Sequence, residues 1–185
     1  QEAKKRNIRH LSLPELQEYF ENSGDKKFRA MQVYEWLWQK HAHSFDAMTN
    51  LSKALRTKLS ADFELPALTV DTAQYSADGT IKSRFKTFDG HLVEGVLIPT
   101  ESRQTACVSS QIGCSLSCKF CATGYMDRKR NLHYDEIYDE VVHIFRQAEN
   151  TYQQKLSNIV FMGMGEPLLN YKNVLKAIER ITSPD

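Results

Sequence analysis

Three of the four cysteines in the chain lie within eight residues, in the stretch GCSLSCKFCATG. Cys114, Cys118 and Cys121 have the spacing C-x3-C-x2-C. Structural zinc usually closes with four ligands, and iron–sulfur clusters are usually held by four thiolates. No fourth cysteine follows, so a four-iron cluster bound here would keep one iron open for a substrate or cofactor. Zinc remains an alternative, because Cys107 or His133 could supply a fourth ligand.

The cysteines lie between a predicted strand at Ala106–Ser110 and a predicted helix at Tyr134–Asn150. A second strand at Asn158–Met162 runs into GMGEP, at Gly163–Pro167, and a second helix begins at Asn170. This β-loop-α-β-loop-α order predicts a parallel sheet, in which the loops after the strands hold the active site. Two such units cannot close a barrel, so we expect a piece of a longer protein.

Before position 106, apolar residues recur first at the spacing of helices and then at the spacing of strands. Residues 10–63 predict three helices, the first with Ser12 as its N-cap and Glu15 as the capping-box partner. Residues 67–110 predict short antiparallel strands separated by turn residues at Ser76–Gly79 and Asp89–Gly90. A small helical domain followed by a β meander is therefore expected ahead of the cysteines.

Composition places the chain among ordinary globular proteins. It has 185 residues, 25% of them charged, and a net charge of +1. No apolar run approaches the roughly 18 residues of a membrane span, and the basic start lacks a secretory signal. A cytoplasmic protein is expected, in which clustered cysteines indicate metal or redox chemistry. Residues 1–60 hold 11 Lys and Arg against 7 Asp and Glu, a weak hint of RNA binding.

The cysteine spacing, with Phe120 before the last cysteine, resembles the radical S-adenosylmethionine (SAM) superfamily. That resemblance implies a [4Fe-4S] cluster whose open iron chelates SAM and whose reduced form cleaves it to a 5′-deoxyadenosyl radical. The implied fold is α/β: an incomplete radical SAM (β/α) barrel in a truncated chain. Its parts would be a helical accessory domain that binds RNA at 1–65, a β-rich connector at 66–105 and the first βα units at 106–185.

Longer motifs are similar to the RlmN/Cfr family of RNA methyltransferases. They are CVSSQIGC through CATG at 107–124, Arg130-Asn-Leu132, and GMGEPLLN at 163–170. The resemblance implies methylation of carbon 2 of adenosine in 23S rRNA and tRNA, through a methyl-carrying cysteine that lies outside this chain. This chain alone would then not complete turnover. The alternative within the family is carbon 8 of the rRNA adenosine; Pro167 and Ile98-Pro99 favour carbon 2.

The resemblance also assigns roles to individual residues. The three clustered cysteines match the cluster ligands, Gly165 and Glu166 match the SAM contact, and Glu94 matches the general base. Cys107 matches a cysteine that releases the RNA adduct by forming a transient disulfide bond. Without the resemblance, Glu94 reads as a solvent-facing strand residue, Cys107 as a small buried hydrophobe and GMGEP as a plain turn.

Partners follow from the same resemblance: the two RNAs, an external flavodoxin-like electron donor, no membrane, and a monomeric enzyme. Candidate RNA contacts are the basic residues of 1–60 together with Lys119, Arg128, Lys129 and Arg130, although the latter group could simply solubilise a loop. Two other hypotheses stay open. One is a different radical SAM enzyme, and the other is a zinc-stabilised RNA-binding module without catalytic activity.

Overall fold

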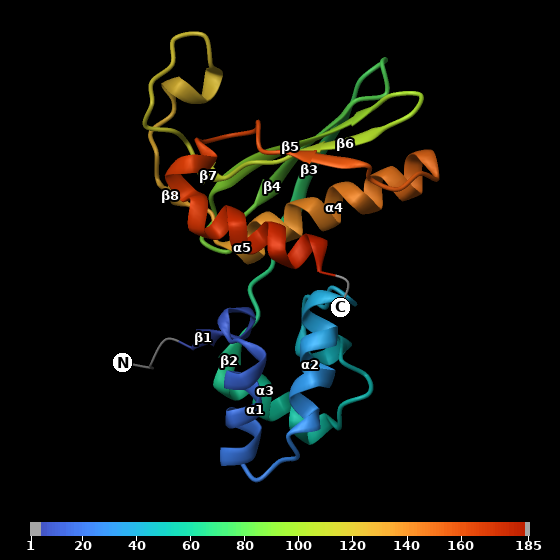
Figure 1. Ribbon diagram of the computed structural model, residues 1–185, viewed down its shortest axis with the longest axis vertical. Coiled ribbons are helices and arrows are strands. Elements are labelled where there is room, and N and C mark those ends of the chain that lie inside the picture. Colours follow the sequence, from blue (N-terminus) through green and yellow to red (C-terminus); the bar gives the residue numbers. More distant parts are fainter. Residues whose placement is uncertain (1–4, 184–185) are drawn as a thin grey trace. The chain divides into compact units, whose positions relative to one another are not determined.

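The computed structural model describes residues 5–183 and divides at Pro66 into two compact units (Figure 1). Residues 1–4 and 184–185, the outer ends of the predicted first and last domains, lie outside the described residues. No helix in the described part is both long and apolar enough to cross a membrane.

The first unit is helical, as its period predicts. It contains α1 (Leu13–Asn22), α2 (Phe28–Trp38) and α3 (Lys53–Asp62), and short strands β1 (Arg6–Asn7) and β2 (Phe63–Glu64) that pair in parallel. The predicted capping box is present. The Ser12 hydroxyl accepts from the Glu15 amide at 3.4 Å, and the Ser12 amide donates to the Glu15 carboxylate at 2.7 Å. The buried side chains of this unit include Ile8, Leu16, Phe20, Val33, Leu37, Met48 and Leu59.

The second unit is built on a five-stranded sheet in the order β3-β4-β5-β6-β9. The strands are β3 (Thr69–Tyr75), β4 (Ile81–Lys86), β5 (Leu92–Pro99), β6 (Gln104–Cys107) and β9 (Asn158–Val160). Neighbours are antiparallel except β6 and β9, which are parallel. The strands expected for the connector at 66–105 therefore continue into the same sheet as the two parallel strands.

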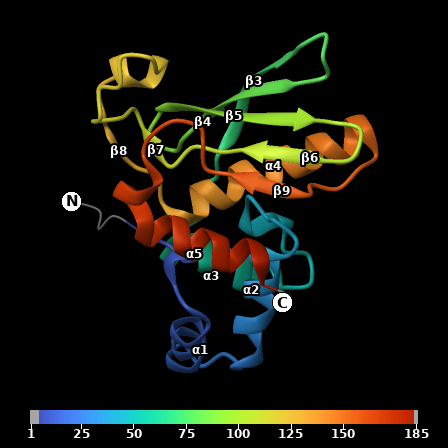
Figure 2. The same cartoon turned by 45° about the horizontal axis from the view of Figure 1, so that its top comes forward.

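Helix α4 (Tyr134–Tyr152) covers one face of this sheet, and α5 (Tyr171–Thr182) packs along α4 on the same side (Figure 2). Burial alternates along β4, with Ile81, Ser83 and Phe85 facing α4. At Gly95 a Cβ atom would lie 3.0 Å from Ile144 of α4, so a larger residue would crowd this contact. Successive side chains of a strand thus point alternately to the face that α4 covers and to the opposite face, which is called the uncovered face below.

The cysteines lie in a projecting loop, drawn in yellow in Figure 1. Short strands β7 (Gln111–Ile112) and β8 (Arg130–Asn131) pair antiparallel and close its base. Within the loop is the 3-10 helix η3 (Ala122–Tyr125), and a second 3-10 helix, η4 (Pro167–Asn170), precedes α5. The paired base anchors the ends of the loop while its tip stays exposed.

Candidate functional site

The cysteine loop is held by close backbone contacts that require glycine. Gly113 has a φ of +73°, and a Cβ atom there would lie 2.2 Å from the carbonyl oxygen of Asp127. At Gly124 a Cβ atom would lie 2.4 Å from the carbonyl oxygen of Cys118. The first and last glycines of the GCSLSCKFCATG stretch thus allow the loop to fold against itself.

Backbone amides also point at the last cysteine of the loop. The Cys121 amide donates to the Cys118 carbonyl at 3.1 Å, and the Gly124 amide donates to the Cys121 carbonyl at 2.9 Å. Hydrogen bonds from the backbone amides of Gly124 and then Thr123 lower the pKa of the Cys121 thiol below its ordinary value. Thiolate is the form that ligates a metal, so this environment favours ligation.

The donor set of the loop fits an iron–sulfur group. Its three thiols are partly exposed, and no carboxylate or imidazole lies between Gly113 and Gly124. Soft thiolate ligands of this kind suit iron–sulfur clusters and zinc. Across residues 5–183, no three His, Cys, Asp or Glu side chains are gathered as a ready-made metal site. All four cysteines are free, so the disulfide bond expected from the resemblance is not supported.

The GMGEP turn packs against the segment that leads into the cysteine loop. The amides of Ser110 and Gln111 both donate to the Met164 carbonyl, at 2.9 and 3.2 Å. Gly165 has a φ of +91°, and a Cβ atom there would lie 2.5 Å from Cβ of Gln111. The two segments that follow the parallel strands β6 and β9 therefore touch directly, as expected for a site at the carboxyl ends of parallel strands.

Glu166 completes this turn in two ways. Its amide donates to Oε1 of Gln111 at 2.9 Å, and its own Oε1 accepts from the Leu168 amide at 3.0 Å as the cap of η4. The carboxylate stays partly exposed. Its carboxylate is therefore fixed in orientation, and a carboxylate can accept a hydrogen bond from an ammonium group.

Glu94 lies on the uncovered face of the sheet. Its neighbours in sequence, Val93 and Gly95, are buried toward α4, so its side chain points the other way. The carboxylate is about 44% exposed and forms an ion pair of 2.9 Å with Nζ of Lys82. This geometry matches the solvent-facing strand residue that the alternation alone predicts, and it leaves the carboxylate reachable by a ligand.

Cys107 shares the uncovered face, because it pairs with Val96, two residues beyond Glu94 in β5. Burial raises the pKa of its thiol, the nearby Glu140 carboxylate adds to that effect, and a hydrogen bond from the Met162 amide opposes it. The thiol is therefore kept protonated more strongly than an ordinary cysteine.

One expected RNA contact has a different role. The Arg130 guanidinium binds Asp89 through Nε at 2.7 Å and Glu136 through Nη1 at 2.7 Å. These hydrogen bonds raise the pKa of Arg130 despite its burial, and the Arg130 hydrogen bond holds the pKa of Asp89 below its ordinary range. Arg130 therefore has a structural role, since its donors join a hairpin turn, the loop base and α4, and its contact with RNA stays a prediction.

Sequence reasoning missed several buried polar residues around the site. Ser109, Glu140 and Asn170 are each at most 3% exposed. Asn170, where the second helix was expected to begin, is the N-cap residue of α5, but its side-chain amide donates to the carbonyls of Ser110 and Leu132 at 2.7 and 2.8 Å and does not cap the helix. The only signal in the sequence was a polar residue inside a predicted strand or an apolar helix face.

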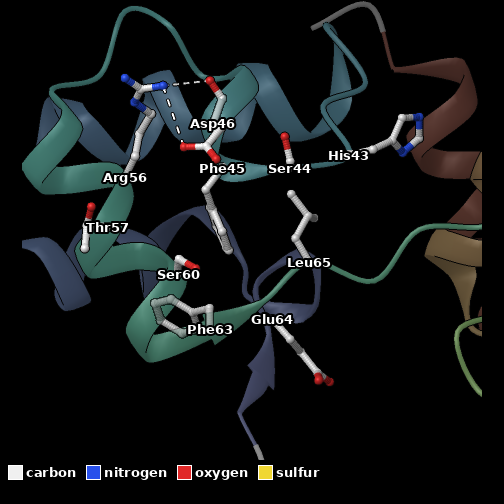
Figure 3. A pocket seen from close by; sticks show the side chains of 10 residues that line it. All are labelled: His43, Ser44, Phe45, Asp46, Arg56, Thr57, Ser60, Phe63, Glu64 and Leu65. Atoms are coloured by element: carbon white, nitrogen blue, oxygen red, sulfur yellow. Dashed lines mark hydrogen bonds and ion pairs between the residues drawn. The ribbon is translucent and has the colours of Figure 1, made fainter.

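The first unit contains a separate, shallow pocket of about 450 Å³ (Figure 3). Arg56 donates from Nη1 to the Asp46 carbonyl at 2.7 Å and lies 3.9 Å from its carboxylate. Hydroxyl groups of Ser44, Thr57 and Ser60 also line it. Opposite charges occur together there, so the pocket does not select a ligand by charge.

The second unit is similar in sequence and structure to one class of known proteins. The sequence model of the radical SAM superfamily matches residues 108–184. A radical SAM methyltransferase from Sphaerobacter thermophilus has a similar structure, with a TM-score of 0.83 and 39% identity, covering 97% of this chain and 52% of that one. The second unit thus belongs to a radical SAM fold.

A second family model and the most similar curated relatives identify the family within this class. The model of the ribosomal RNA large subunit methyltransferase N-terminal domain matches residues 6–65. A probable dual-specificity RNA methyltransferase RlmN of Cytophaga hutchinsonii is 61% identical over 184 residues, covering 100% of this chain and 50% of the relative. One of Christiangramia forsetii is 58% identical, with coverages of 98% and 52%. The chain belongs to the RlmN family and spans about half the length of these curated relatives.

Proposed function

We propose that the full-length protein is a radical SAM methyltransferase that methylates carbon 2 of adenosine in 23S rRNA and tRNA. The observation that carries this proposal is the contact of the GMGEP turn with the segment that leads into the cysteine loop, at the carboxyl ends of β6 and β9. It is supported by relatives named as dual-specificity RNA methyltransferases along the whole of this chain.

Each candidate residue has a role suited to its surroundings. Cys114, Cys118 and Cys121 would hold a [4Fe-4S] cluster, which supplies the reducing electron for SAM cleavage. The Gly165 backbone and Glu166 carboxylate would bind the amino-acid end of SAM, since the carboxylate is oriented by the Leu168 amide and stays partly exposed. The methyl group would pass through a cysteine outside this chain, so this chain alone would not complete turnover.

Glu94 and Cys107 would act on the RNA adduct from the uncovered face. Glu94 would accept the adenine proton once Lys82 moves away from its carboxylate. Cys107 would release the product, and its protonated resting thiol would first have to lose a proton. We place this monomeric enzyme in the cytoplasm, with a flavodoxin-like protein as the electron donor.

Product analysis tests this proposal. The reconstituted full-length protein is incubated with SAM, reductant and either a 23S rRNA fragment or tRNA, and the digested nucleosides are separated by mass spectrometry. The expected product is 2-methyladenosine, lost in Glu94→Gln and kept in Glu101→Gln, a matched change in an exposed turn. Exclusive 8-methyladenosine would assign the Cfr-type reaction, and unmodified RNA would contradict both.

A further inference from the structure

Ser109 is a fully buried serine between the strand of Glu94 and the turn of Gly165. Its hydroxyl donates to the Glu94 carbonyl at 2.6 Å and accepts from the Met164 amide at 2.9 Å. A serine hydroxyl has one donor and two acceptor sites, so both contacts can be made at once. One side chain therefore joins the two segments that carry the proposed base and the proposed cofactor contact.

The Ser109 hydroxyl lies just beyond the last residue pair of β5 and β6. The β5–β6 register stops at Val96 and Cys107, and continuing it by two residues would place Glu94 opposite Ser109. On the other side, β6 and β9 pair last at Cys107 and Val160, and backbone hydrogen bonds continue past them, from the Val108 amide to the Val160 carbonyl at 2.9 Å and from the Gly163 amide to the Val108 carbonyl at 3.0 Å. The Ser109 hydroxyl adds the link to the Glu94 carbonyl, beyond the last residue pair of β5 and β6.

The position of Ser109 is itself fixed. Its amide donates to Oε2 of Glu140, on α4, at 2.8 Å. At Gly163 a Cβ atom would lie 2.8 Å from the Ser109 hydroxyl oxygen and 2.7 Å from the Val108 carbonyl oxygen. The Ser109 backbone is thus fixed by Glu140 and its hydroxyl lies close against Gly163, so the hydroxyl can hold one spacing between its two partners.

We propose that Ser109 is a positioning residue, whose hydroxyl sets the spacing between the strand of Glu94 and the turn of Gly165 and Glu166. The functional part of this inference rests on the proposed function, while the contact itself does not. Removing the hydroxyl leaves the Glu94 carbonyl and the Met164 amide without this partner in a buried site.

Hydrogen exchange in the present chain tests the contact without any cofactor. In Ser109→Ala the Met164 amide should exchange about tenfold faster than in the wild type. Ser110→Ala is the matched control, because Ser110 is a buried neighbour that contributes only backbone groups to the described hydrogen bonds. It should leave Met164 unchanged. Ser109→Thr, which keeps the hydroxyl, should restore the protection.

Unchanged exchange at Met164 in Ser109→Ala would overturn the contact. Equally faster exchange throughout α4 would also overturn the inference, because the hydroxyl would then support the whole unit and not one spacing. If Ser109→Ala does not fold, Ser109→Thr gives the answer: wild-type protection of Met164 supports the contact, and faster exchange at Met164 with α4 still protected overturns it.

A second experiment uses the full-length protein with its cluster and RNA, and measures SAM cleaved per adenosine methylated. A misplaced base should waste cleaved SAM, so Ser109→Ala should raise this ratio about tenfold. A merely structural role would reduce the active fraction and leave the ratio unchanged, which would overturn the inference. If the wild type methylates no RNA, the proposed function is contradicted. The hydrogen-exchange experiment would still test the contact of the Ser109 hydroxyl.

Discussion

Gly165 illustrates how single residues set the site. Two features require glycine here: its φ of +91° is left-handed, and a Cβ atom would lie 2.5 Å from Gln111, in the segment before the cysteine loop. The family resemblance implies that this glycine contacts SAM, which stays a prediction. The crowding against Gln111 was not predictable, since it depends on two loops that are more than 50 residues apart.

Gly165→Ala should lower the free energy of unfolding by about 2 kcal/mol more than Gly90→Ala. Gly90 has a similar φ of +83°, but a Cβ atom there would meet nothing within 4 Å, so the comparison isolates the crowding. Far-ultraviolet circular dichroism in urea follows the unfolding of both units, so the transition of the second unit is the part of the signal that tryptophan fluorescence does not share. Both tryptophans, Trp36 and Trp38, lie in the first unit, and their fluorescence is the internal control. Equal losses in the two variants would show that the close approach costs nothing.

At the scale of elements, the start of α4 differs most from its prediction. Asp135, Glu136 and Asp139 lie in its first turns, where exposed acids would complement the helix dipole. The structure buries all three, and the Asp139 carboxylate accepts from the Leu68 amide at 3.0 Å. The bounds of α4 and its apolar face could be predicted from the helical spacing of its apolar residues alone. The polar partners could not, because they come from segments distant in sequence.

Arg130→Ala should cost about 3 kcal/mol of stability in the second unit. The substitution leaves the carboxylate of Glu136, whose side chain is 5% exposed, without its cation. Urea unfolding followed by circular dichroism measures the change. Lys129→Ala is the matched control, because Lys129 only approaches the exposed Asp127 at 3.8 Å and should change stability by less than about 1 kcal/mol. Similar small losses in both variants would contradict a structural role for Arg130.

At the scale of the whole molecule, the chain joins a helical unit to a sheet that changes from antiparallel to parallel at β6. The helical and strand segments and the parallel crossover could be predicted from their periods. The single continuous sheet could not, because pairing between β5 and β6 depends on register. Glu140 was also beyond prediction: it is fully buried in the middle of α4, and its Oε1 atom has no hydrogen-bond partner among the described residues.

Glu140 should make the stability of the molecule depend on pH. Burial raises its pKa well above the ordinary 4.5, so the folded state holds a proton that the unfolded state releases. Stability is then fully present below about pH 4.5 and falls as pH rises toward the folded pKa. Glu140→Gln should therefore melt at a higher temperature than the wild type at pH 8, and the difference should shrink toward pH 4. A difference that is constant across this range would contradict the burial of an ionisable carboxyl group.

The proposed function depends most on whether the three loop cysteines hold an iron–sulfur cluster. The direct measurement is the iron and sulfide content of the chain after anaerobic reconstitution, compared with Cys118→Ala and with Cys107→Ala. We predict about four irons and four sulfides per chain, lost in Cys118→Ala and retained in Cys107→Ala. Zinc without sulfide, or equal iron in the wild type and Cys118→Ala, would contradict the claim.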